Sequence, residues 1–204
     1  MKRNILAVAA GAALALNAFS AFAESSSAAG GSGGSTSANL DFQLTIPKFL
    51  RLQVGTAGAT IDRIDFTPTV GQLATTPSTV VNATAGSGDL GNGSVTVTVQ
   101  ANPNTDVVNL TYTTTAANLS DGGTNTVPWS TIGVATSGAD AASLTHPATL
   151  ADGSAGDVNV VAPVTVTAGV INLSAIWTYT WNDGGTIYPA AVYTGRVAYR
   201  ISTP

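Results

Sequence analysis

The sequence predicts an all-β protein, an antiparallel β-sandwich of the Greek-key, immunoglobulin-like kind with seven to nine strands. Thr, Ala, Val, Gly and Ser dominate the composition, whereas Glu and Met occur once each. β-Branched residues suit a pleated, half-buried surface, and residues that favour helices are scarce. Short runs of alternating apolar and polar residues follow one another, separated by Gly, Asn and Asp turn signals. No repeat of fixed period is present, which argues against a propeller or a solenoid.

The first residues have the pattern of a secretory signal peptide. Lys2 and Arg3 are positively charged, the run Ile5–Leu16 is apolar, and small residues lead to Ala23. The pattern predicts a signal peptide over residues 1–23. The apolar run is shorter than the roughly 20 residues that cross a bilayer, and no later stretch is longer, so we expect no membrane span after cleavage.

The remainder of the chain reads as one domain behind a flexible segment. Residues 24–38 are rich in Gly and Ser, which predicts a flexible N-terminal segment, and residues 39–204 are long enough for a single domain. Five basic and eleven acidic residues follow residue 23, a net charge of −6 that disfavours nucleic acid as a partner. The chain has no cysteine, so core burial and strand pairing must hold an exported domain without disulfides.

The longest alternating segment is Leu40–Val54. Seven of its eight even-numbered positions are large and apolar, and six of its seven odd-numbered positions are polar or Pro. This pattern predicts an extended strand with one face buried. Fifteen residues at about 3.3 Å each would span roughly 50 Å. Because strands are usually shorter, we expect two strands joined at Pro47, or one strand that extends beyond its own domain.

Further strands are predicted by the same alternation at 61–66, 94–100, 107–114, 158–167, 171–181 and 192–201. The second and third of these are expected to form a hairpin around residues 101–106. The stretch 115–157 is polar and rich in Gly, and predicts a long loop region with room for two weak strands. Its large apolar anchors are Trp129, Ile132, Val134, Leu144 and Leu150.

No residue set predicts an enzyme or a cofactor. His146, the single histidine, has Asp140 and Ser143 nearby, but the segment lacks a G-x-S-x-G elbow and favours a surface histidine. Asp62 and Asp65 are the only close pair of acids, and positions three apart on a strand face opposite sides. They therefore do not fit a glycosidase pair.

Two binding features have alternative interpretations. The Asp-bearing turns at Asp121, Asp152 and Asp183 could supply oxygen ligands for calcium, or be ordinary turns, and none completes a calcium-loop motif. The aromatic row of Trp177, Tyr179 and Trp181 could stack on sugars or fill the core. The core is favoured, because the same face of the strand continues with other large apolar residues.

The plan of the chain resembles secreted bacterial pilin and fimbrial subunits that assemble by donor-strand complementation. Three features carry the resemblance: the signal peptide, the flexible segment followed by the alternating strand Leu40–Ile46, and an all-β body ending in the strand Tyr193–Ile201. In that family an N-terminal strand of one subunit completes the sandwich of the next. The chain departs from the common pattern in having no disulfide, and in placing Tyr199 five residues before its end.

The resemblance implies a structural subunit of an extracellular filament or pilus-like assembly at the surface of a Gram-negative-type bacterium. Residues 39–46 would be the donor strand, with Leu40, Phe42, Leu44 and Ile46 as the interface. The implied partners are copies of the same chain, with a periplasmic chaperone and an outer-membrane assembly protein. The alternative is a monomeric secreted adhesin or carbohydrate-binding module, which exposed tryptophans would favour.

Overall fold

The computed structural model describes residues 26–27, 29–30, 34–73, 78–102, 107–147, 149–152, 156–165 and 170–203, with side chains for all but 107 and 156–165. The predicted signal peptide and part of the predicted flexible segment lie outside these residues. The chain divides between Ile46 and Pro47 into two units. Within the described part of the first unit, no residue belongs to a helix or strand.

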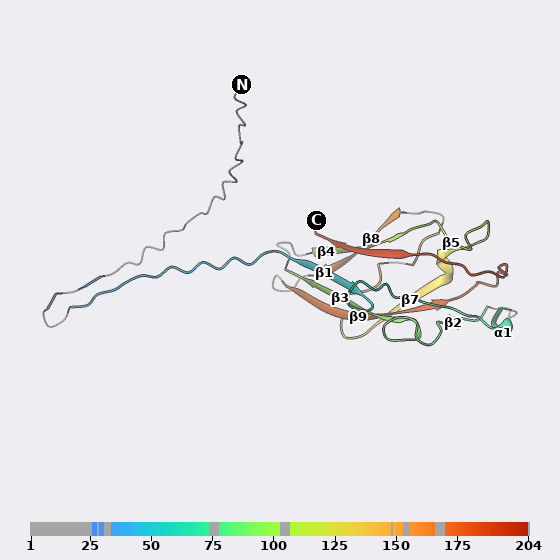
Figure 1. The fold of residues 1–204 in the computed structure, drawn as a ribbon, viewed down its shortest axis with the longest axis horizontal. Helices are drawn as coiled ribbons and strands as arrows, with labels where there is room; N and C mark the ends of the chain where they lie inside the picture. The colour runs from blue at the N-terminus through green and yellow to red at the C-terminus, as the bar shows by residue number, and fades with distance from the viewer. Residues whose placement is uncertain are drawn as a thin grey trace, which may run out of the picture. The chain divides into compact units, whose positions relative to one another are not determined.

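The second unit is built from antiparallel strands with almost no helix, which confirms the all-β prediction (Figure 1). The strands are β1 (Leu50–Val54), β2 (Val81–Asn82), β3 (Ser94–Ala101), β4 (Val107–Thr114), β5 (Leu119–Ser120), β6 (Thr126–Val127), β7 (Ile132–Ser137), β8 (Gly156–Thr165), β9 (Ile171–Trp181) and β10 (Val197–Ser202). A short helix α1 (Val70–Leu73) and a 3-10 turn η1 (Trp129–Thr131) complete the elements. Ten strands are described, whereas the sequence predicted seven to nine. Three of the ten are only two residues long.

The strands form two larger sheets and one small hairpin. In the first sheet, β3 lies between β1 and β9, and β7 pairs with the opposite edge of β9. The two-residue β2 pairs with the end of β9, beyond the end of β3. In the second sheet, β4 lies between β10 and β8. The hairpin joins β5 to β6.

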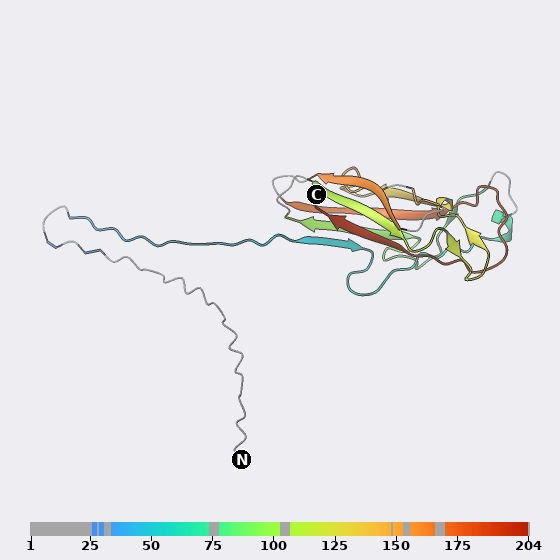
Figure 2. The ribbon, with the colours of Figure 1, turned by 90° about the horizontal axis from the view of Figure 1, so that it is seen from above.

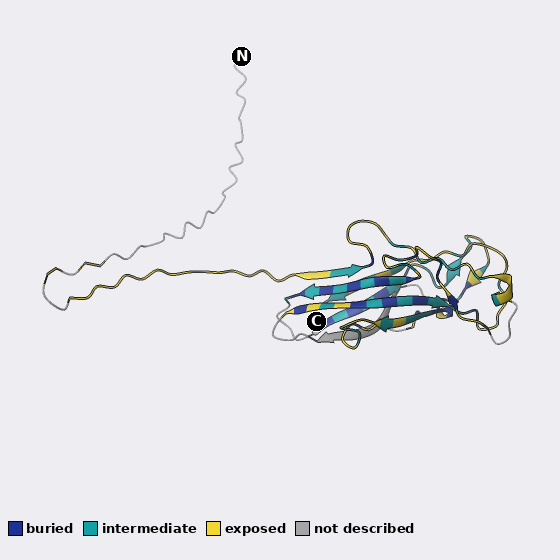
Figure 3. Ribbon diagram, turned by 90° about the horizontal axis from the view of Figure 1, so that it is seen from below, coloured by how far each residue is buried: buried dark blue, intermediate teal, exposed yellow. Residues whose placement is uncertain are grey.

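The core combines inward faces from both larger sheets. Buried and partly exposed residues alternate along β3 without exception, and the same period runs through most of β9 (Figure 3). Val97 and Trp177 in the first sheet, and Leu110 and Tyr112 in the second, are fully buried in one cluster. Alternation places these side chains on one face of each strand. The aromatic row of β9 therefore packs into the core, as predicted, with Trp181 partly buried at its end.

Three strands follow the sequence pattern closely. The predicted strands 94–100, 107–114 and 171–181 correspond to β3, β4 and β9 with boundaries that differ by one residue at most. β8 begins two residues before its predicted start and lies at a sheet edge, pairing among the described strands only with β4. That position tolerates Pro163, which has no N–H to donate to a ladder. Within the described residues, no helix is long and apolar enough to span a bilayer.

The alternating segment is a strand only in its second half. β1 begins at Leu50, and residues 40–49 belong to no strand. Asn102 connects this region to β3, because its side chain donates to the Pro47 carbonyl at 2.9 Å and accepts from the Phe49 N–H at 2.6 Å. The expectation of one strand across Leu40–Val54 is therefore wrong, and of the two strands expected to join at Pro47 only the second is present, as β1. Ladder hydrogen bonds require a neighbouring strand, and the structure provides one, β3, only from Leu50 onward.

The predicted hairpin between residues 94–100 and 107–114 is also wrong. Both edges of β3 are occupied, by β1 and β9, and β4 belongs to the other sheet. The connection therefore passes from one sheet to the other. Alternation alone did not distinguish the two arrangements, because both place the apolar faces of the two strands in a core.

The segment Ile61–Phe66 is not the predicted strand. Its backbone bonds to a turn instead of a ladder, since the Thr84 N–H donates to the Asp65 carbonyl at 2.7 Å and the Gly88 N–H donates to the Arg63 carbonyl at 3.2 Å. Ile64 and Phe66 still pack against the core. These two side chains thus face inward against a loop, whereas Ile61 is 68% exposed.

The stretch 115–157 is more ordered than the predicted loop. It contains β5, β6, η1, β7 and the start of β8. Trp129 is 3% exposed, and its indole N–H donates to the Ala116 carbonyl at 2.9 Å. A Cβ on Gly195 would lie 2.6 Å from the Trp129 ring and 2.8 Å from Leu119, so this crossing requires glycine. Trp129 therefore joins the stretch to the segment before β10.

Gly195→Ala should destabilise the body by about 1–3 kcal/mol, because the added methyl overpacks against a buried tryptophan. Gly71→Ala is the matched control, since a Cβ there has only a Thr69 oxygen at 4.0 Å. Urea denaturation of both variants measures the difference. Equal midpoints for the two variants would contradict the close packing at Gly195.

Candidate subunit interface

The four predicted donor residues lie exposed in the first unit. Leu40, Phe42, Leu44 and Ile46 are 70%, 89%, 84% and 70% exposed. A row of alternating apolar side chains is normally buried against a core. Exposed apolar residues are common on protein surfaces when they are scattered singly, but not when they form a row. Four in register on one face therefore constitute a surface without a partner in the described residues of the chain.

β1 and β10 form open sheet edges that lie beside each other (Figure 2). Each pairs along one side only among the described strands, β1 with β3 and β10 with β4. Their inward apolar residues are incompletely covered. These partly buried residues are Leu52, Val54, Val197, Tyr199 and Ile201. The wall of the core is thus incompletely covered along β1 and β10.

The register of β10 shows which of its backbone groups are free. The Thr115 N–H donates to the Arg196 carbonyl at 3.0 Å, and the ladder continues with Val197 opposite Thr114. Hydrogen-bonded and non-hydrogen-bonded pairs alternate in an antiparallel ladder. The N–H and C=O groups of Val197, Tyr199 and Ile201 therefore point away from β4, toward the open edge.

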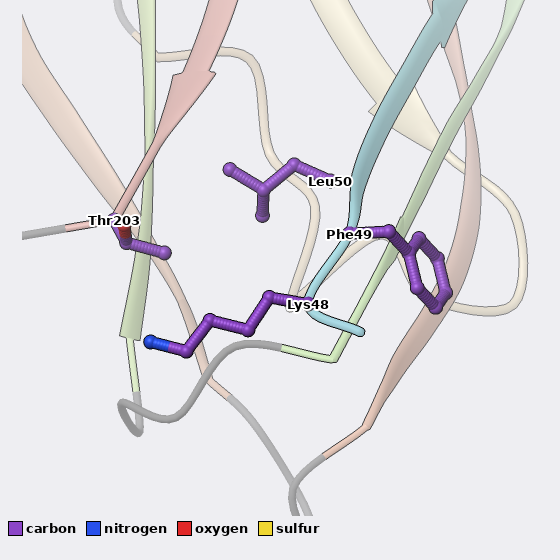
Figure 4. A pocket seen from close by; sticks show the side chains of 4 residues that line it. All are labelled: Lys48, Phe49, Leu50 and Thr203. Atoms are coloured by element: carbon purple, nitrogen blue, oxygen red, sulfur yellow. The ribbon is translucent and has the colours of Figure 1, made fainter. Parts of the chain in front are cut away.

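A shallow pocket of 280 Å³ lies where the start of β1 meets the end of β10. It is lined by Lys48, Phe49, Leu50 and Thr203. Figure 4 shows Lys48 and Leu50 pointing toward Thr203, while Phe49 points away. The first residues of β1 are therefore at the same end of the sheets as the last residues of β10.

Basic residues border the open edge. Arg196 and Arg200 are exposed, and neither has an ion-pair partner among the described side chains. Arg51 on β1 instead donates to Gln100 at 2.9 Å, and Arg63, further away in the sequence, pairs with Asp65 at 2.7 Å. Neither β10 nor β4 contains an acidic residue. The edge therefore carries positive charge that its own two strands do not neutralise.

His146 is not the surface histidine that the sequence favoured. It is partly buried, with ring centroids of Tyr112, Trp177, Tyr179 and Tyr199 within 6.2 Å of its own. Its Nε2 lies 2.8 Å from the Tyr199 hydroxyl, which lies 2.8 Å from the Tyr179 hydroxyl. Aromatic packing and this hydrogen-bond chain attach the loop of His146 to β9 and β10.

The loop that carries His146 is held by core aromatics. The Trp177 indole donates to the Leu144 carbonyl at 3.2 Å, and the Tyr112 hydroxyl donates to the Thr149 carbonyl at 2.9 Å. Leu144 is fully buried. The sequence did identify this leucine as an anchor, but a single histidine in a polar stretch gave no signal of the aromatic surroundings.

The residues considered for catalysis do not converge. The Asp140 carboxylate accepts from the Ser174 N–H at 2.8 Å, rather than orienting His146. Asp62 accepts from Thr56 at 2.9 Å, and Asp65 pairs with Arg63. The histidine bonds a tyrosine of the core, so the triad geometry is not formed.

Each of the three Asp-bearing turns uses its carboxylate in hydrogen bonds within the body, locally at Asp121 and Asp183 and to a distant residue at Asp152. Asp121 accepts from Gly123 and Asn125, and these bonds hold the pKa of its carboxyl below the ordinary value, the Asn125 amide contributing most. Asp152 accepts from the Ser130 N–H at 2.7 Å, and Asp183 from a turn N–H at 2.9 Å. Within the described residues, no group of three or more His, Cys, Asp or Glu side chains could hold a metal ion.

The tryptophans that would have favoured a sugar-binding module are in the core. Trp129 and Trp177 are 3% and 0% exposed, and Trp181 is partly buried. Neither buried ring offers a face for stacking.

Comparison with known proteins gives no match to a family model, to a curated protein or to a solved structure.

Burial raises the pKa of Tyr179 to about 12, and burial together with the neighbouring Tyr179 raises the pKa of Tyr199 well above its ordinary value of 10.0. Above pH 10 the unfolded chain loses these phenolic protons while the folded state retains them. The free energy of unfolding should therefore fall from about pH 10 through pH 12.

Thermal melts at pH 7–12 measure this slope, which should be shallower for Tyr199→Phe. The matched control is Tyr188→Phe, whose hydroxyl makes no hydrogen bond in the described part of the chain. An unchanged slope in Tyr199→Phe would contradict the assignment of the buried phenol.

Proposed function

We propose that the protein is a structural subunit of an extracellular filament, in which residues 39–46 of one copy add a strand to β10 of the next. One observation carries the proposal: in the described chain the alternating apolar residues at 40–46 are exposed and unpartnered, and β10 has an open, half-covered sheet edge. The apolar residues lack a surface that would bury them, and the edge of β10 lacks a neighbouring strand. Strand addition to an open edge joins ladder hydrogen bonds to the filling of pockets by alternate side chains.

The sizes of the two parts support this pairing. Leu40–Ile46 is seven residues long and β10 is six, so the ladders match in length. Burying a large apolar side chain contributes about 1.5–3 kcal/mol. Four such side chains, together with hydrogen bonds to the free backbone groups on every second residue of β10, favour the addition and oppose the conformational entropy lost in ordering the segment.

The body in this proposal is a β-sandwich with immunoglobulin-like, Greek-key connections whose wall is incomplete between β1 and β10. Support comes from the strand order, with β1, β3, β9 and β7 in one sheet and β10, β4 and β8 in the other, and from the single core that both sheets share. An incoming strand beside β10 would cover Val197, Tyr199 and Ile201.

The surroundings follow from the same proposal. The predicted signal peptide directs the chain across the inner membrane, and the assembly lies at the cell surface of a Gram-negative-type bacterium. The partners are further copies of the chain. A periplasmic chaperone and an outer-membrane assembly protein would protect and deliver the open edge, since such edges otherwise pair indiscriminately. No catalytic step is part of the function.

Replacing Leu40, Phe42, Leu44 and Ile46 together by Ser should abolish polymerisation of the mature protein, because the added strand would then fill no pockets. The control variant is Gln43→Ser/Thr45→Ser, which changes only the opposite face of the segment. Negative-stain microscopy and light scattering measure filaments. Thermal melts should be unchanged in the monomer, since these side chains are exposed there.

Filaments from the wild type and the control, but not from the fourfold variant, would support the proposal. A wild-type protein that stays monomeric at high concentration and with native surface material would overturn it. Equal polymerisation of all three proteins would show that filaments form through another surface.

A further inference from the structure

The segment proposed to insert beside β10 has one charged side chain, and the edge that would receive it has two. Asp41 is the only charge in Leu40–Ile46, and it is exposed on the face opposite the apolar row. On β10 and the residue before it, Arg196 and Arg200 are exposed on the face opposite Val197, Tyr199 and Ile201. Charge complementarity can therefore strengthen the addition of the strand.

The antiparallel arrangement that covers the edge completely brings Asp41 to Arg200. It places Leu40, Phe42 and Leu44 opposite Ile201, Tyr199 and Val197, the residues whose backbone groups are free. Those pairs become the hydrogen-bonded ones. Asp41 and Arg200 then form a non-hydrogen-bonded pair, in which the Cα atoms approach to about 4.5 Å and the side chains are closest.

A parallel arrangement would bring Asp41 to the other arginine. With Leu40 opposite Gly195 and Ile46 opposite Ile201, the apolar row again faces inward, but Asp41 lies opposite Arg196. Parallel addition is also the only one that connectivity allows if the segment folds back on its own body. Three residues separate Ile46 from β1, whose start meets the end of β10.

We infer that Asp41 strengthens strand exchange at this interface, by pairing with Arg200 of a second copy in antiparallel addition. The inference rests on the proposed function. An antiparallel ladder is slightly more stable per residue than a parallel one, which favours the Arg200 pairing over the Arg196 pairing. The partner of Asp41 therefore differs between the two cases: Arg200 in antiparallel exchange between copies, and Arg196 in closure of a copy on itself.

Charge reversal in the full mature chain tests the inference. Asp41→Lys and Arg200→Glu alone should each raise the critical concentration for filament growth by about fivefold, because attraction at one pair is replaced by repulsion. The double variant D41K/R200E should restore it. Arg196→Glu is the matched control and should change it by less than about twofold.

Mixing the two single variants gives a second readout. In an alternating filament the lysine introduced by D41K meets the glutamate introduced by R200E, and Asp41 of the second chain meets Arg200 of the first. The mixture should therefore polymerise like the wild type, whereas each variant alone does not. Self-closure cannot produce this rescue, since both partners would then belong to one chain.

The outcomes separate the inference from the proposed function. Wild-type filaments with equal critical concentrations for D41K, R200E and the wild type would overturn the role of Asp41 and leave strand addition standing. A raised critical concentration for Arg196→Glu, with an unchanged one for R200E, would replace the antiparallel arrangement by the parallel one. A wild type that never polymerises would overturn the proposed function itself.

Discussion

The inward face of β9 is buried in the core that both larger sheets share, and the rest of the body depends on this burial. β9 pairs with β3 on one edge and β7 on the other, and Trp177 on its inward face is fully buried. Burying a tryptophan of about 200 Å² contributes roughly 5 kcal/mol. Because the chain has no cysteine, such burial and the ladder bonds hold the domain without covalent help.

The sequence predicted inward faces better than it predicted neighbours. The alternation in β3, β4 and β9 identified their buried residues and nearly their ends, because period 2 follows from strand geometry itself. It did not show that β3 and β4 belong to different sheets, since either arrangement buries the same valines. In Ile61–Phe66, Ile64 and Phe66 face inward but Ile61 is exposed, and a turn at Thr84–Gly88 takes the place of a neighbouring strand.

The candidate interface was predictable on one side only. The apolar row at Leu40–Ile46 is visible in the sequence, and its side chains are exposed in the described chain, as expected of residues that would be buried by a partner. The receiving edge was not predictable, because the openness of β10 depends on which strands the topology places beside it. Likewise the aromatic surroundings of His146 come from three strands that are distant in sequence. Arg196 and Arg200 also give the edge a charge that opposes pairing between two identical edges.

The junction at Pro47 has a mechanical consequence. The side chain of Asn102, just after β3, forms hydrogen bonds with the backbone of Pro47 and Phe49. β1 then runs antiparallel to β3 over five residue pairs. Tension that draws Pro47 outward along the axis of β1 would load those backbone bonds together, in shear, rather than opening them one after another like a zipper. The load would pass from the tether through β3 into β9, which pairs with β3 on one edge and with β7 on the other. The chain segment where tension would enter is therefore hydrogen-bonded directly to β3, a strand with a neighbour on both edges.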